Sequence, residues 1–176
     1  MKFSLLLVDA NIIIELFRLG IWETFITRCD VHLSETVLNE ARFYEDDDGQ
    51  EHSINLAQYQ GSGAITVHDV DASQLAALYN TLGANLLEKM DAGEAELLCV
   101  LENASVSEQY LVCSADAVIY RYLGATYRTT QGISLEEVLG GIGMTRKLNH
   151  QFSKRFRDRF SQLGFEQGFT GQARQP

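Results

Sequence analysis

Short apolar runs alternate along this chain with longer segments in which apolar residues recur every three or four positions. The short runs predict strands, and the three-to-four spacing predicts amphipathic helices. The predicted strands span residues 4–8, 31–33, 64–68, 110–113 and 125–128. The predicted helices span residues 10–19, 22–27, 35–44, 72–87, 92–104, 116–123, 134–140 and about 145–163. This alternation is typical of an α/β fold in which helices cover both faces of a mostly parallel sheet.

The length and composition fit one domain. The 176 residues are 45% hydrophobic, and a chain of this size buries about 70% of its unfolded surface on folding. The one proline is Pro176, and no Gly/Ser-rich or Pro-rich stretch marks an internal linker. We therefore predict a main domain at residues 1–144. Residues 145–176 are predicted to form a basic helix and tail that pack on this domain or extend from it.

Two aspartates stand where predicted strands end. The apolar run at residues 5–8 leads into Asp9, and the run at residues 110–113 leads through Ser114 into Asp116. In parallel α/β folds, ligands bind beyond the carboxyl ends of the strands. Both aspartates are also suited to cap the helix that follows, and Ser114 is suited to an ordinary turn. The sequence leaves both interpretations open.

Two glutamates fall on the apolar faces of predicted helices. Glu40 shares helical spacing with Val37 and Tyr44, which predicts a buried position. Glu94 is the one charge on a stripe formed by Leu97, Leu98 and Leu101. Asp91 and Glu94 also have the spacing of a capping box, which is the local alternative for Glu94.

Acidic groups that are buried together repel one another. At a separation of about 4 Å and an effective dielectric constant near 20, one such pair costs about 4 kcal/mol. A bound divalent metal, a proton held at a raised pKa or nearby basic side chains could offset this cost. The nearby basic residues, Arg42, Lys89 and Arg121, are few and scattered. Carboxylates without cysteine or imidazole suit hard ions, so we favour Mg²⁺ or Mn²⁺.

Four short motifs around these acids resemble those of the PIN-domain nucleases, over about residues 3–135. They are LVDANIIIEL at 7–16, the segment from Leu33 and Ser34 through Val37 to Glu40, GEAEL at 93–97, and VCSAD at 112–116. The family's fourth motif often carries a second acid, whereas Ala115 and Ala117 flank Asp116 here. The chain is also longer than the commonest PIN-domain toxins.

The resemblance implies a PIN-like three-layer α/β/α sandwich and a ribonuclease activity that depends on Mg²⁺ or Mn²⁺. Asp9, Glu40, Glu94 and Asp116 would then be the catalytic, metal-binding residues. Asn11 and Ser114 would orient a carboxylate or a metal-bound water. The partners that it implies are an RNA substrate and an antitoxin protein of a toxin-antitoxin module, and a homodimer is a further candidate.

The formal net charge of -10 disfavours broad coating of nucleic acid. The acidic run at residues 45–51 is predicted to be a solvated loop, and basic residues concentrate near the C-terminus. An RNA contact there would use Lys154, Arg155, Arg157 and Arg159. The alternative is an ordinary solvated helix face.

The remaining polar and sulfur-containing residues suggest no second site. His32, His52, His68 and His150 belong to no shared motif and are expected at the surface or at sheet edges. Cys29, Cys99 and Cys113 are widely spaced, which argues against a disulfide framework or a zinc site. With no stretch long enough to span a membrane, a cytoplasmic location is expected.

The leading functional hypothesis is a metal-dependent phosphodiesterase that cleaves single-stranded RNA. The alternative is a catalytically silent PIN-like module that binds RNA or protein. A phosphoaspartyl enzyme or receiver is disfavoured, because Asn11 replaces the second acid of dehalogenase-like phosphatases and no late-strand lysine is found.

Overall fold

The computed structural model describes residues 3–82, 86, 88–105 and 107–169. Its centre is a five-stranded sheet of β5 (Ile65–His68), β2 (Cys29–Ser34), β1 (Phe3–Val8), β6 (Leu111–Cys113) and β7 (Gly132–Ile133), in that spatial order. Each neighbouring pair is parallel. The prediction of a three-layer α/β/α arrangement around a mostly parallel sheet is confirmed.

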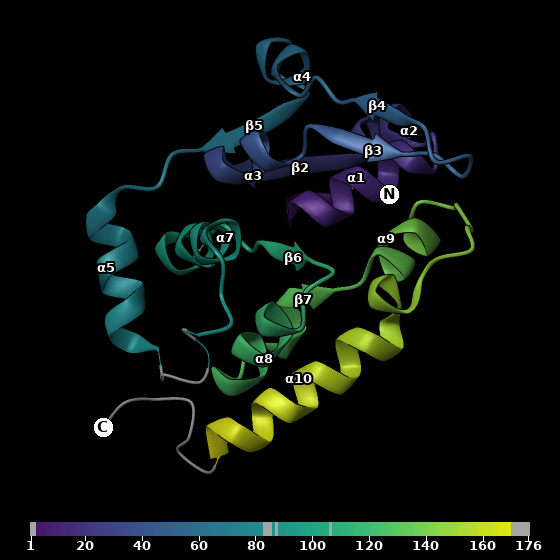
Figure 1. The fold of residues 1–176 in the computed structure, drawn as a ribbon. Helices are drawn as coiled ribbons and strands as arrows, with labels where there is room; N and C mark the ends of the chain where they lie inside the picture. Colours follow the sequence, from purple (N-terminus) through teal and green to yellow (C-terminus); the bar gives the residue numbers. More distant parts are fainter. Residues whose placement is uncertain (1–2, 83–85, 87, 106, 170–176) are drawn as a thin grey trace.

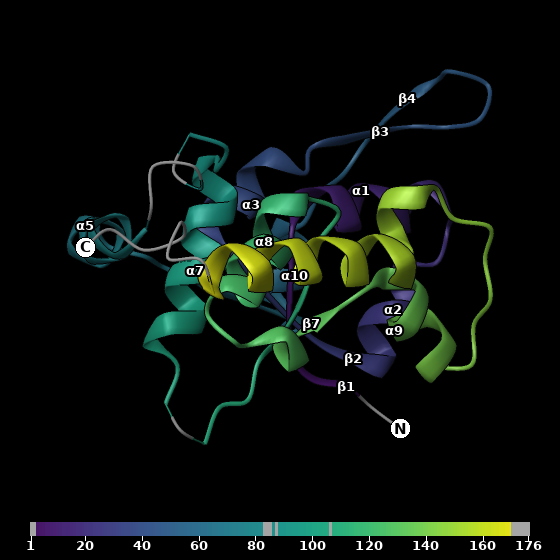
Figure 2. The ribbon, with the colours of Figure 1, turned by 90° about the horizontal axis from the view of Figure 1, so that it is seen from below.

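Helices cover both faces of the sheet. Helices α7 and α8 lie on one face with α10 outside α8, and α1 and α2 lie on the other (Figure 1, Figure 2). The described helices are α1 (Ala10–Arg18), α2 (Trp22–Arg28), α3 (Glu35–Glu40), α4 (Ala57–Gly61), α5 (Ala72–Thr81), α7 (Ala92–Asn103), α8 (Ala117–Ala125), α9 (Leu135–Gly141) and α10 (Lys154–Phe169). None of the helices in the described ranges is both long and apolar enough to cross a membrane.

The core lies between the central strands and these helices. Leu6, Leu7 and Val8 of β1 have no exposed surface, and neither do Leu97 and Leu98 of α7. A strand that is apolar at consecutive positions is buried on both faces, as expected for the centre of a parallel sheet. The core therefore fixes β1 and α7, which carry Asp9 and Glu94.

The helix predicted at residues 35–44 is too long. Helix α3 ends at Glu40, and the chain forms a hairpin of β3 (Phe43–Glu45) and β4 (Glu51–Ser53) that projects from the body (Figure 2). The ring of Tyr44 stacks on those of Phe17 and His52, which favours the extended conformation over another helical turn. The acidic run, predicted as a loop, therefore forms the tip and adjoining strand ends of this hairpin.

The strand predicted at residues 125–128 is also wrong. Tyr127 adopts a left-handed conformation with φ of 60°, and Arg128 N donates to Leu123 O at 2.7 Å. Tyr127 N donates to Gly124 O at 3.1 Å. These bonds form a Schellman motif that ends α8. The last strand is the short β7 instead.

Two other predicted helices differ in extent. The basic helix predicted from residue 145 begins only at Lys154, after a 3-10 turn at His150–Phe152. The helix predicted at residues 72–87 is described as α5 up to Thr81, and residues 83–85 and 87 lie outside the described residues. The end of the predicted tail, residues 170–176, lies outside them as well.

Helix α10 packs against α8 by direct backbone contact. A Cβ atom on Gly164 would lie 2.0 Å from the carbonyl oxygen of Arg121, and one on Gly124 would lie 2.1 Å from that of Ser161. Contacts this close are accessible only without a side chain. Helix α10 is therefore seated tightly on the domain rather than extending away from it.

We expect Gly164→Ala to lower the free energy of unfolding by about 2 kcal/mol or more, because the added methyl group must push α10 off α8. Gly140→Ala is the matched control, since a Cβ atom at Gly140, in α9, would meet nothing within 4 Å. That variant should be neutral or slightly stabilised. Urea denaturation measures both. Equal stability of the two variants would contradict the seating of α10.

Candidate functional site

The candidate site lies where the strand order reverses. The chain passes from β1 to β2 and β5 on one side, and then returns to β6 and β7 on the other side of β1. In parallel α/β sheets, the carboxyl ends of the two strands that flank such a point form a crevice for ligands. Asp9 follows β1 and Ser114 follows β6, so both flank this reversal.

Asp9 joins the two sides of the reversal. Its carboxylate caps α1 by accepting from Ile12 N at 2.8 Å. The other oxygen accepts from Ser114 Oγ at 2.5 Å and from Ala115 N at 2.9 Å. Asp9 is 5% exposed. The expected cap is therefore present, and the same carboxylate also fixes the loop after β6.

The hydroxyl group of Tyr120 holds the loop after β6 through hydrogen bonds. The phenol oxygen of Tyr120 lies 3.2 Å from Ser114 N, 2.8 Å from Ser114 O and 2.9 Å from Ile133 O. Ser114 Oγ also accepts from Asp116 N at 2.9 Å. Asp116 then caps α8 by accepting from Val118 N at 2.8 Å. Ser114 thus connects the two aspartates.

Glu94 reaches the same place from the N-terminus of α7. It forms the expected capping box with Asp91: Glu94 N donates to Asp91 Oδ1 and Asp91 N donates to Glu94 Oε2, both at 2.9 Å. Its side chain also hydrogen-bonds that of Asp116. Glu94 is 7% exposed. Glu94 therefore forms the capping box expected from local spacing and also lies at the candidate site.

Glu40 is not buried, contrary to its predicted position. Because α3 ends at this residue, the buried face expected from a longer helix does not form, and Glu40 is exposed. Its carboxylate nevertheless turns toward α7, since a Cβ atom on Gly93 would lie 2.9 Å from Glu40 Oε2. Gly93 therefore leaves the space in which this carboxylate lies.

Two hydrogen bonds between Thr36 of α3 and Glu96 of α7, called the Thr36–Glu96 clamp below, hold Glu40 near the other acids. Glu96 accepts from Thr36 N at 3.0 Å and from Thr36 Oγ1 at 2.7 Å. Neither this pair nor the role of Tyr120 was expected from the sequence. Their partners lie elsewhere in the chain, so local spacing gives no signal for them.

Other predicted residues have separate positions. Asn11 is exposed on the first turn of α1. Lys154, Arg155 and Arg159 are exposed and line one shallow groove on α10. Arg157 instead donates to Glu137 Oε1 at 2.6 Å and is 17% exposed. The structure therefore separates Arg157 from the other three basic residues.

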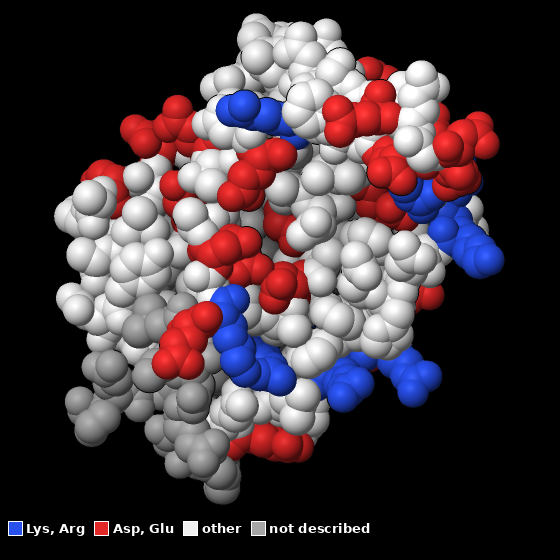
Figure 3. Space-filling view, in the orientation of Figure 1, with Lys and Arg blue, Asp and Glu red and all other residues white. Residues whose placement is uncertain are grey.

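The four acids form one electrostatic cluster. Acidic side chains gather around a hollow in the middle of the face shown in Figure 3. Burial raises the pKa of Asp9, and the charge of Asp116 adds to this effect. Partial desolvation of the Glu40 carboxyl group, next to α7, raises its pKa although the residue is largely exposed, and the charges of Asp91, Glu96 and Asp9 raise it further.

The pKa of Glu94 is raised as well. Burial, together with the nearby Asp116 and Asp91, raises its pKa to about 8. A proton on Glu94 at neutral pH is consistent with the hydrogen bond between its carboxyl group and the side chain of Asp116. This shared proton removes one negative charge from the cluster.

The donor set suits a hard divalent ion in its chemistry, because it consists of carboxylate oxygens. However, no three acidic, histidine or cysteine side chains within the described ranges are arranged to hold a metal ion. The oxygens of Asp9 and Glu94 already accept bonds from backbone N–H groups. An ion bound by these residues would have to replace the proton between Glu94 and Asp116.

Comparisons of the chain with protein-family models, curated proteins and solved structures find no match. The resemblance to the PIN-domain nucleases therefore stands on the four motifs.

The raised pKa of Glu94 predicts a loss of stability with increasing pH. Below pH 4.5, the ordinary value, this residue is protonated in both folded and unfolded chains, whereas between pH 4.5 and about 8 only the folded chain keeps the proton. The free energy of unfolding should fall across this range, by at most about 1.4 kcal/mol per pH unit for one group.

Thermal denaturation at low salt, in the absence of divalent ions, measures this dependence. Glu94→Gln should flatten it, and Glu51→Gln, which changes an exposed acid of the hairpin, should keep the wild-type slope. The same slope in wild type and Glu94→Gln would show that Glu94 is not the group that holds the proton.

Proposed function

We propose that this protein is a Mg²⁺- or Mn²⁺-dependent endoribonuclease that cleaves single-stranded RNA in the cytoplasm. The observation that supports this most is the convergence of Asp9, Glu94 and Asp116 at the reversal of strand order. The PIN-like motifs contain the same three residues. By that resemblance, an antitoxin protein and a second copy of the chain are candidate partners.

The proposed site residues have distinct tasks. Asp9, Glu94, Asp116 and Glu40 would hold the divalent ion, which supplies positive charge that lowers the pKa of a water and offsets charge on the phosphate. Ser114 keeps Asp9 and Asp116 at a fixed separation through its hydroxyl group. Binding of the ion by Glu94 and Asp116 would require loss of the proton between them. Asn11 is exposed beside Asp9 and is available to the substrate or to water.

A second candidate function is a catalytically silent PIN-like module that binds RNA or protein. Two observations favour it. The cluster has capping roles that need no metal, because Asp9, Glu94 and Asp116 all contribute to helix N-termini. In addition, Ala115 and Ala117 flank Asp116, so no second acid is present there. Cleavage of mixed single-stranded RNA with Mg²⁺, Mn²⁺ or EDTA distinguishes the two functions.

We expect Glu94→Gln and Asp116→Asn each to reduce metal-dependent cleavage by about 100-fold or more, as for the loss of a group that stabilises the transition state. Glu40→Gln should reduce it less, because Glu40 is exposed. Asp48→Asn, at the hairpin tip, is the control and should keep full activity. Full activity in both Glu94→Gln and Asp116→Asn would contradict the assignment.

The expected effect of Asp9→Asn differs from that of the other variants. The asparagine side-chain amide would direct its NH₂ group toward a hydrogen-bond donor in either of its two orientations. That donor is Ile12 N in one orientation, and Ser114 Oγ and Ala115 N in the other. This variant should therefore lose stability as well as activity. Circular dichroism and thermal denaturation, measured beside cleavage, separate the two effects.

The exposed basic residues of α10 predict a role in substrate binding. Replacing Lys154, Arg155 and Arg159 by Gln should raise KM for RNA while kcat stays nearly constant. The salt dependence of binding should become shallower by about one unit for each phosphate contact that is lost. Steady-state kinetics at several salt concentrations provide the measurement.

Arg157→Gln is the matched control on the same helix. Because Arg157 binds Glu137, this variant should lose about 1 kcal/mol of stability and leave the salt dependence unchanged. A fall in kcat without any change in salt dependence, in the triple variant, would instead show that the three residues support the fold or a dimer.

A further inference from the structure

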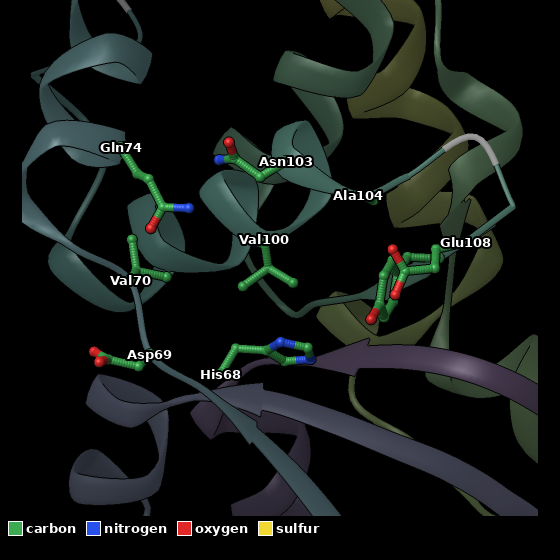
Figure 4. A pocket seen from close by; sticks show the side chains of 9 residues that line it. His68, Asp69, Val70, Gln74, Val100, Asn103, Ala104 and Glu108 are labelled. Carbon is green, nitrogen blue, oxygen red and sulfur yellow. The ribbon is translucent and has the colours of Figure 1, made fainter.

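A small pocket lies on the sheet face that α7 covers. Its volume is about 130 Å³, and its lining includes His68 at the end of β5, Tyr110 before β6, and Asn103 at the end of α7 (Figure 4). Asn103 lies nine residues, or about 13 Å, along α7 from Glu94. The pocket is therefore separate from the acidic cluster.

A histidine pair lies beneath this pocket. Nδ1 of His32 is 2.8 Å from Nε2 of His68, and the ring of Tyr110 packs edge-on against both imidazoles. His32 is 7% exposed, which contradicts the surface or edge position expected from the sequence. Two ring nitrogens at this distance share one proton, with one as donor and the other as acceptor.

The surroundings of His32 select its tautomer. Its Nε2 is buried, has no hydrogen-bond partner within the described chain, and lies 3.5 Å from Asp30 Oδ1. A carboxylate favours a proton on the nitrogen that faces it. Nδ1 of His32 then accepts from Nε2–H of His68, which leaves a lone pair on Nδ1 of His68. Figure 4 shows the His68 ring at the floor of the pocket, below Val100.

The other polar groups of the pocket are mostly acceptors. The amide nitrogen of Asn103 donates to Cys99 O, so its carbonyl oxygen is left for a ligand. Asp69 and Glu108 add two carboxylates. Gln74 is the exception, since its oxygen accepts from Asp71 N and its NH₂ group is left. None of the described residues that line the pocket is a lysine or arginine.

We propose that this pocket binds a small cationic group that carries N–H donors, namely a guanidinium or a primary ammonium. The two carboxylates disfavour an anion, and the acceptors match several N–H groups at once. The NH₂ group of Gln74 can meet a carbonyl oxygen next to the cation. The cation belongs either to a free small molecule or to an arginine or lysine side chain of another protein. This proposal does not depend on the nuclease function.

The test is a titration of the full chain with methylguanidinium, followed by NMR of the histidine and backbone resonances. Binding should shift the signals of His68 and Tyr110, and long-range nitrogen–proton spectra should show a proton on Nε2 of His68. The double variant Asp69→Asn/Glu108→Gln should bind roughly fivefold more weakly or worse, as expected for partly exposed charge pairs.

Two controls separate this pocket from other acidic surfaces. The double variant Asp48→Asn/Glu51→Gln removes two hairpin charges, and Glu94→Gln changes the acidic cluster; both should bind as the wild type does. Equal weakening in the pocket variant and the hairpin variant would overturn the proposal, because the effect would then reflect net charge.

Two further ligands identify the source and the chemistry. Tighter binding of acetyl-Gly-Arg-Gly-amide than of methylguanidinium would support a protein side chain as the source of the cation. Equal affinities would support a free small molecule. Tetramethylammonium has no N–H donor and should bind more weakly than either. Equal binding of tetramethylammonium, or no shift at His68 with millimolar methylguanidinium and peptide, would overturn the proposal.

Discussion

The carboxylate of Asp9 is the connection on which the candidate site depends. It caps α1 through Ile12 N and, with its other oxygen, fixes Ser114 and Ala115, more than 100 residues away in the sequence. A buried carboxylate is tolerated only when such donors surround it. The loop after β6 therefore needs Asp9 for its position, and Asp9 needs the loop in order to be buried. Asp116 takes its place from the same loop, through Ser114 Oγ.

The convergence of helix N-termini explains how the acids can lie together. Helices α1, α7 and α8 begin at the site, and each presents unpaired N–H groups and the positive end of its dipole there. Asp9, Glu94 and Asp116 satisfy these groups, and the proton on Glu94 removes one charge. The repulsion that suggested a metal from the sequence is thus reduced without one. Metal binding, in the function proposed here, would be an exchange of ion for proton.

Local pattern was sufficient for the residues whose neighbours in sequence determine their position. Asp9 and Asp116 follow apolar strands, and Glu94 follows a capping residue, so their placement was predictable. Glu40 was misplaced because stacking of Tyr44 on Phe17 ends α3 early. The Thr36–Glu96 clamp and the His32–His68 pair depend on which strands and helices become neighbours. Such contacts leave no trace in a single sequence.

The packing of α10 determines which of its basic residues face solvent. Contact between Gly164 and the Arg121 carbonyl fixes the rotation of this helix about its axis. With that rotation, Arg157 faces Glu137, and Lys154, Arg155 and Arg159 face solvent. Sequence spacing alone grouped all four residues as RNA contacts. The contact at Gly164 separates Arg157 from the other three basic residues. The surface that α10 can offer to phosphate groups therefore depends on an uncharged residue.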